Sequence, residues 1–227
     1  MKLKYAAYIE SASGKMGNVV ASTGKGGAYQ RARVIPFNPK STAQTTARAN
    51  MTTVSQDWKG LTEGQRVAWN SAAPNWISTG IFGNKLEPSG FNLYVKLNLN
   101  LLTIGVAQIV SPPTKSAVAS LSTFSAAQVH AGATTLTFTA TPAPAGSSVI
   151  VEATAPQSAG RYSIKSQYRV IAVLAAGQAS PYTATTVYNA KFGTPGAAGQ
   201  KVFFRIKSVS STTGQIGASL TAVATVS

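Results

Sequence analysis

The chain has 227 residues and is 44% hydrophobic, which suffices for one large domain or two small ones with hydrophobic cores, so a disordered chain is not expected. Charged residues make up only 11% of it, well below the roughly 25% of an ordinary soluble domain. There is no cysteine, which excludes disulfides and thiolate chemistry. No apolar stretch approaches the ~18 residues of a membrane span, and none follows the N-terminal lysines as in a signal peptide. We therefore expect neither a membrane-spanning segment nor a signal peptide.

The charge is strongly unbalanced but spread along the chain. There are 20 Lys and Arg against 5 Asp and Glu, for a formal net charge of +15, and residues 1–40, 41–110 and 111–227 contribute +6, +2 and +7. A diffuse positive field favours nucleic acid, an anionic polysaccharide or an acidic protein as partner and does not choose among them. A weakly charged surface is typical of proteins that pack against copies of themselves, so a homo-oligomer is expected.

Residues 1–40 predict an extended β-hairpin arm. The strand-prone segment 16–22 is followed by the turn TGKGG, and the segment 28–35 returns as a second strand. The prolines of IPFNPK then end the arm, because proline removes a donor and favours extended geometry in the residue before it.

The arm carries the candidate binding surface. Tyr29, Arg31 and Arg33 alternate along the returning strand and so share one face, and Lys15 and Lys25 lie on the preceding segments. Such a group can contact phosphates and stack on a base, or it can lie on an acidic neighbouring subunit. We prefer the second interpretation, because the arm lacks the density of aromatic residues found in single-strand binders.

Residues 41–110 predict a helical module. Ser41 with Gln44, and Thr62 with Gln65, have the spacing of capping boxes at the starts of two short helices. Apolar residues follow each box at helical spacing, and we interpret them as the core of a helical hairpin rather than as a ligand platform: Met51, Val54, Trp58, Trp69 and Trp76.

The segment FNLYVKLNLNLLTIG is ambiguous. Its apolar residues alternate as in a strand, but the run is long for a strand and is rich in Leu and Asn. Ser89 is a suitable N-cap and Gly105 a suitable stop, so we predict a third helix, with a strand as the alternative.

A proline-containing linker at 111–117 separates this module from residues 118–227, which predict an antiparallel β-sandwich. Turn signals separate strand-like runs at 134–141, 147–154, 166–174, 183–192, 201–209 and 219–226, and a seventh strand is expected near 118–129. The predicted class is therefore α+β in two parts: a β-arm with a short helical hairpin, then an all-β sandwich.

Few residues here can carry out catalysis. His130 is the only histidine, lies in a predicted turn and has no GxSxG motif to accompany it. The five carboxylates are scattered, and Asp57 and Glu63 have ordinary roles near helix ends, so paired-carboxylate chemistry and hard-cation sites are not expected. The glycine-rich SGKMGN and TGKGGAY do not fit the phosphate-loop pattern. We predict no catalytic residue, no cofactor, no metal site and no small-molecule substrate.

Residues 13–104 contain a composite motif: SGKMGNVV, GAYQRARVIPFNP, STAQTTAR, WKGLTEGQRVAW and GFNLYVKLN in this order. It resembles a family of small proteins found in phage genomes and phage-like elements. The resemblance implies a virion component whose N-terminal module docks into the particle, and it implies no catalytic residue. In the spacing of their strand-like runs and turns, residues 118–227 are similar to fibronectin type III or immunoglobulin-like modules. They lack the Cys–Trp–Cys signature of a true immunoglobulin domain.

These features predict a non-enzymatic structural subunit of a bacteriophage particle, associated with capsid or tail, with other virion proteins as partners. One alternative is a basic nucleic-acid-binding protein packaged with the genome. Another is a carbohydrate-binding adhesin, for which the candidate aromatics are Tyr162, Tyr168, Tyr182 and Tyr188.

Overall fold

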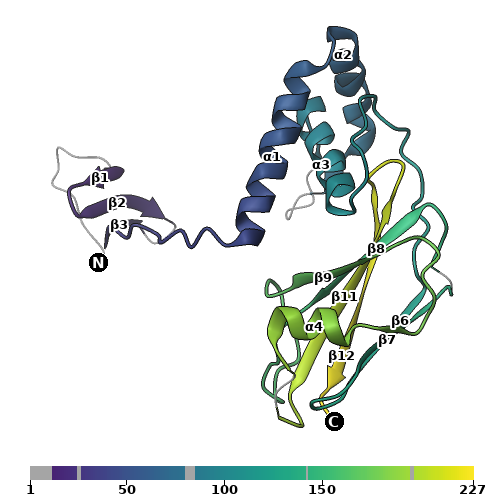
Figure 1. The fold of residues 1–227 in the computed structure, drawn as a ribbon. Helices are drawn as coiled ribbons and strands as arrows, with labels where there is room; N and C mark the ends of the chain where they lie inside the picture. Colours follow the sequence, from purple (N-terminus) through teal and green to yellow (C-terminus); the bar gives the residue numbers. More distant parts are fainter. Residues whose placement is uncertain (1–11, 25–26, 80–84, 142, 195–196) are drawn as a thin grey trace. The chain divides into compact units, whose positions relative to one another are not determined.

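The structure is a computed structural model that describes residues 12–24, 27–79, 85–141, 143–194 and 197–227 (Figure 1). The chain divides into two compact units, Met1–Thr45 and Thr46–Ser227. Helices and antiparallel sheets both contribute, so the predicted α+β class is confirmed.

The first unit contains a three-stranded antiparallel sheet in the order β1-β2-β3. Its strands are β1 (Gly14–Met16), β2 (Val19–Gly24) and β3 (Gly27–Ala32). The single strand predicted over 16–22 is wrong, because Gly17 has a φ of 57° and the chain turns there. Glycine adopts this left-handed conformation without steric cost. The arm is therefore a three-stranded meander, and residues 1–11 of the prediction lie outside the described residues.

Helices and a small two-stranded sheet follow. Their bounds are α1 (Thr42–Gly60), α2 (Glu63–Ala72), the 3-10 helix η1 (Ala73–Trp76), β4 (Ser78–Thr79), β5 (Lys85–Leu86) and α3 (Gly90–Thr103).

The helix starts follow local capping chemistry. At Thr62 both bonds of the capping box form: the hydroxyl accepts from the Gln65 N–H at 3.3 Å, and the Gln65 side chain accepts from the Thr62 N–H at 2.9 Å. At Ser41 the bond from the Ser41 N–H to the Gln44 side chain forms, at 3.3 Å. The Ser89 hydroxyl caps α3, so the predicted third helix is confirmed and the strand alternative is wrong.

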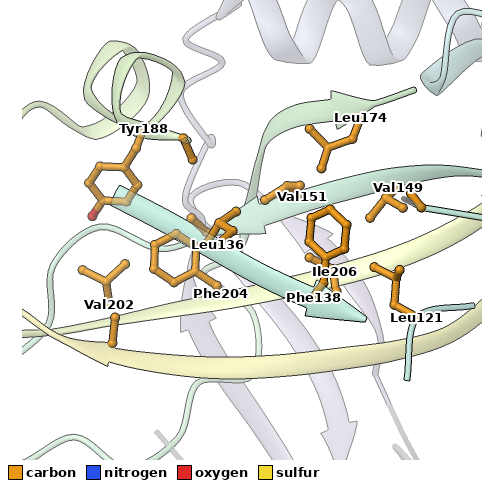
Figure 2. Packing of buried hydrophobic residues seen from close by; sticks show 14 of the residues in the cluster. Leu121, Leu136, Phe138, Val149, Val151, Leu174, Tyr188, Val202, Phe204 and Ile206 are labelled. Carbon is orange, nitrogen blue, oxygen red and sulfur yellow. The ribbon is translucent and has the colours of Figure 1, made fainter. Parts of the chain in front are cut away.

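Strands from residue 123 onward form two further antiparallel sheets, in the orders β10-β7-β6 and β12-β11-β8-β9. The bounds are β6 (Thr123–Gln128), β7 (Thr134–Thr139), β8 (Ser147–Ala153), β9 (Arg169–Leu174), β10 (Tyr182–Thr183), β11 (Lys201–Ser210) and β12 (Ile216–Thr225). Both sheets contribute side chains to one buried cluster, in which Leu136 and Phe138 of β7 lie close to Val151, Phe204 and Ile206 of the larger sheet (Figure 2).

One predicted strand is a helix. Of the run 183–192, only its first residue belongs to a strand, and α4 (Thr185–Phe192) takes up the rest. The run is rich in β-prone residues, but helical spacing lets Tyr188 enter the core, where it is fully buried and its hydroxyl donates to the Thr154 carbonyl at 3.1 Å. Tertiary packing here overrides the local preference.

Helix α3 contacts the turn between β11 and β12. The Asn100 side-chain amide donates to the Gly214 carbonyl at 2.8 Å, and a Cβ atom on Gly214 would lie 2.2 Å from the Leu97 carbonyl oxygen. Only glycine fits at this contact. The predicted linker 111–117 lies within the second unit, where the Ser116 N–H donates to the Gln215 side chain at 3.3 Å.

Candidate functional site: the basic face of the N-terminal sheet

Strand register brings the predicted basic residues of the arm onto one face. Lys15 pairs with Val20, which in turn pairs with Arg31, and directly paired residues in an antiparallel sheet point to the same side. Tyr29 precedes Arg31 by two residues and Arg33 follows it by two, so both share that side. The Arg33 N–H extends the ladder by donating to the Asn18 carbonyl at 2.8 Å. Lys25, predicted for the same group, lies outside the described residues.

The cations of this face are open to solvent. Lys15, Arg31 and Arg33 are exposed, and none forms an ion pair with a residue in the described part of the chain. Tyr29 is half-exposed, at 36%. On the opposite side of the sheet, Ala21 is buried. The basic face thus presents three positive side chains and one aromatic ring on the same side of the sheet, an arrangement suited to an anionic partner.

The segment that follows is an exposed apolar strap, residues 33–41. The strand predicted over 28–35 ends at Ala32, so Val34 and Ile35 belong to this strap. Every residue of it is exposed, and Val34, Ile35 and Phe37 are 78%, 75% and 88% exposed. Large apolar side chains gathered on an exposed surface mark contact sites. In the sequence, Pro36 interrupts the apolar residues Val34, Ile35 and Phe37 and removes a backbone donor, which stops the strand from continuing through them.

The predicted core of the helical module is placed with one correction. Val54, Trp69 and Trp76 are buried and Trp58 is half-buried, but Met51 is 42% exposed. The buried stripe of α1 starts at Val54, since the nine residues from 41 to 49 are all exposed and the packing against α2 and α3 involves the C-terminal half of the helix. Met51 is therefore a surface residue.

The tryptophans have structural roles. Trp69 packs edge-on against Tyr94 with 5.2 Å between ring centroids, and its indole N–H donates to the Val110 carbonyl at 2.9 Å. Trp58 contacts the same tyrosine at 5.3 Å. Burial first, and then the charge of Asp57, raise the pKa of Tyr94. These contacts make Trp69 and Tyr94 part of the buried cluster of the helical module, with Trp58 packed against it.

Among the residues that the structure describes, no group of three or more His, Asp or Glu side chains is arranged to hold a metal ion. His130 lies exposed in the turn between β6 and β7, where its backbone N–H donates to the Ser227 carbonyl at 2.7 Å. Glu63 pairs with Arg66 at 3.3 Å, and Asp57 accepts from the Gln108 side chain at 2.7 Å. The carboxylate of Glu152 bonds Arg205 and Lys207.

The four candidate tyrosines of residues 118–227 differ in their exposure to solvent. Tyr188 is fully buried and Tyr182 is half-buried in the core, whereas Tyr162 is 86% exposed. Tyr168 is half-buried, and burial raises its pKa. Only Tyr162 and Tyr168 are available to a ligand.

None of the helices in the described ranges combines the length and the apolar character that a membrane crossing requires. The chain matches no protein-family model, and comparison with curated proteins and with solved structures returns no match.

Proposed function

We propose that this chain is a non-enzymatic structural subunit of a bacteriophage particle. The composite motif of residues 13–104 supports the assignment through its resemblance to phage-encoded proteins. In this proposal the N-terminal part docks into the capsid or tail, and the β-region is exposed or packs between subunits, so the protein's location is the virion.

The exposed apolar strap is the observation that carries the proposal. Its side chains Val34, Ile35 and Phe37 are each at least 75% exposed. Covering three such side chains favours association by about 1.5–3 kcal/mol each when burial is complete. The flanking basic face adds electrostatic attraction to an acidic neighbour, which speeds encounter and fixes orientation more than it adds affinity. A neighbouring virion subunit is the partner that satisfies both features.

The strand order supports a fibronectin type III or immunoglobulin-like sandwich for residues 118–227. The first, second and fifth strands of this region form one sheet, and the third, fourth, sixth and seventh form the other. Two antiparallel sheets divided in this way support a sandwich similar to a fibronectin type III module. Such modules host many functions, so this likeness supports the architecture but does not indicate a function. The virion proposal is therefore argued from the N-terminal part.

Purified phage particles test the proposal. We expect mass spectrometry of particles made by cells that carry this gene to find the chain at a copy number consistent with a repeated subunit. A variant lacking residues 1–35 is expected to fold, as judged by a cooperative thermal transition, but to be missing from the particles. Normal incorporation of that variant would refute docking through the arm. Particles that lack the intact chain would refute the virion assignment.

The register of the N-terminal sheet favours one second candidate, a nucleic-acid-binding protein packaged with the genome, because it aligns Lys15, Tyr29, Arg31 and Arg33. Binding through phosphates weakens steeply as salt rises. A mobility-shift series across salt concentration, repeated with Arg31→Gln, tests it. An unchanged salt slope in the variant would exclude this face as the contact.

A further inference from the structure

Strand β11 carries a row of cations on the outer face of the four-stranded sheet, the face turned away from the core. Lys201, Phe203, Arg205 and Lys207 occupy alternate positions, of which Phe203 is buried, and the residues between them that enter the core cluster are Val202, Phe204 and Ile206. Because successive side chains of a strand point to opposite sides, the three cations share the outer face.

Two tyrosines from the connection between β8 and β9 lie on these cations. The Lys201 ammonium is 4.4 Å from the ring centroid of Tyr162, and the Arg205 guanidinium carbon is 4.2 Å from that of Tyr168. Both distances are within the range of cation–π attraction. Since Tyr162 is 86% exposed, most of its ring surface remains open to solvent.

Hydrogen bonds hold this connection against the sheet. The backbone N–H of Gln157 donates to the Lys201 carbonyl at 2.8 Å, and the backbone N–H of Lys201 donates to the Gln157 carbonyl at 3.0 Å. The Arg161 guanidinium donates to the Gln157 side-chain oxygen at 2.8 Å. The Arg161 guanidinium is thus positioned beside Lys201 before any ligand arrives, which reduces the entropy lost on binding.

The charges of this face are poorly balanced. Glu152 is the only acidic residue in 111–227, and its carboxylate already accepts from Arg205 and, at 2.8 Å, from the Lys207 ammonium. Its side chain is 11% exposed, so it offers little to a sugar hydroxyl. Lys201 and Arg161 have no ion pair with a described residue, and the surface beside Tyr162 is therefore positive.

We propose that this surface, which we call the β11 basic face (Arg161, Tyr162, Tyr168, Lys201 and Arg205), binds an acidic polysaccharide. A sugar ring stacks on Tyr162, and its carboxylate or sulfate is held by Lys201 and Arg161. The inference is independent of the virion assignment and goes beyond it.

Two observations favour a polysaccharide over single-stranded nucleic acid. The face offers one largely exposed aromatic platform, Tyr162, whereas single-strand binders stack successive bases on successive rings. The neighbouring strand β12 places hydroxyls next to the cations, because Thr221 pairs with Arg205 and Ser219 pairs with Lys207. Hydroxyl side chains both donate and accept hydrogen bonds, as sugar hydroxyls require.

Biolayer interferometry with the full chain tests the proposal against immobilised polygalacturonate, hyaluronan, neutral dextran and single-stranded poly(dT). We expect binding to the two acidic polysaccharides, none to dextran and less to poly(dT). Tyr162→Ala and Lys201→Gln are each expected to weaken binding roughly tenfold, the loss of one good contact. Lys201→Gln lowers the dependence of affinity on salt, whereas Tyr162→Ala leaves it unchanged because no charge is removed.

Matched variants separate a defined site from the diffuse charge of the protein. Lys191→Gln removes the same charge as Lys201→Gln, but from the last turn of α4, away from the proposed face. An equal loss of affinity in Lys191→Gln and Lys201→Gln would overturn the proposal, as would a failure to bind either acidic polysaccharide. Stronger binding to poly(dT), lost in Tyr162→Ala, would reassign the face to nucleic acid. Because Tyr162 is exposed, thermal transitions of its variant are expected to match those of the parent chain.

Discussion

The two compact units differ in how much of themselves they bury. Of the described residues between 12 and 45, Ala21 alone is buried, whereas the second unit contains two buried clusters, one around Trp69 and one around Phe204. Apolar burial is the main favourable contribution to folding, so the second unit has the larger source of stability. The described part of the first unit instead leaves Val34, Ile35 and Phe37 in solvent, where a partner can cover them.

The largest effect is expected in the helical core. Trp69→Ala removes a fully buried ring that packs on Tyr94 and leaves the Val110 carbonyl without its donor. The free energy of unfolding is expected to fall by about 3–5 kcal/mol. Denaturant unfolding followed by tyrosine and tryptophan fluorescence measures this. A loss below 1 kcal/mol would mean that this cluster is not part of a cooperative core.

A smaller loss is expected at the contact between α3 and the turn after β11. Gly214→Ala places a Cβ atom 2.2 Å from the Leu97 carbonyl oxygen at a φ of 69°. We expect a loss of about 2–4 kcal/mol from overpacking and backbone strain together. Gly199→Ala is the matched control, because its φ is 87° but nothing lies within 4 Å of the added atom. Equal losses in the two variants would contradict the close approach to α3.

Tyr188→Phe tests the buried hydroxyl of α4. Without the bond to the Thr154 carbonyl, stability at neutral pH is expected to fall by about 1 kcal/mol. Burial raises the pKa of Tyr188, so the folded state keeps the proton longer than the unfolded state. This contribution is complete below the ordinary tyrosine pKa of about 10 and is lost as pH rises above it.

The free energy of unfolding, measured with denaturant at pH 8 and again above the ordinary tyrosine pKa, therefore separates Tyr188→Phe from the parent chain. The parent chain is expected to lose more stability over this interval than Tyr188→Phe does. Tyr162→Phe, at an exposed position, is expected to follow the parent. A parallel decline in parent and Tyr188→Phe would exclude Tyr188 as a source of the alkaline loss.

A substitution in the strap is expected to have the smallest effect on stability and the largest effect on assembly. Phe37→Ser changes a side chain that is 88% exposed, so the free energy of unfolding is expected to stay within about 0.5 kcal/mol. Incorporation into particles is expected to fall by roughly tenfold or more, because the interface with the neighbouring subunit loses the buried ring of Phe37. Val67→Ser, at an exposed position of α2, controls for surface hydrophobicity and is expected to leave incorporation unchanged. Equal incorporation of Phe37→Ser and the parent would contradict docking through the strap.

Local chemistry in the sequence was sufficient where an element depends on its own residues. The capping box at Thr62 and Gln65 and the Ser89 cap of α3 involve atoms within three residues of each other, and they predicted helix starts correctly. The strands β7, β8 and β11 also followed from their β-prone runs between turn signals. The shared face of Tyr29 and Arg31 follows from strand alternation alone.

Tertiary structure decided the features that depend on distant partners. Residues 185–192 are helical because the core accepts Tyr188, and Met51 is exposed because α1 contributes Val54 and Trp58, and not Met51, to the cluster it shares with α2 and α3. The alignment of Lys15 with Arg31 required the register through β2, and the stacking of Tyr162 on Lys201 required a connection folded back onto its sheet. Residue spacing along the chain determines local hydrogen bonds, but it does not specify which surfaces meet.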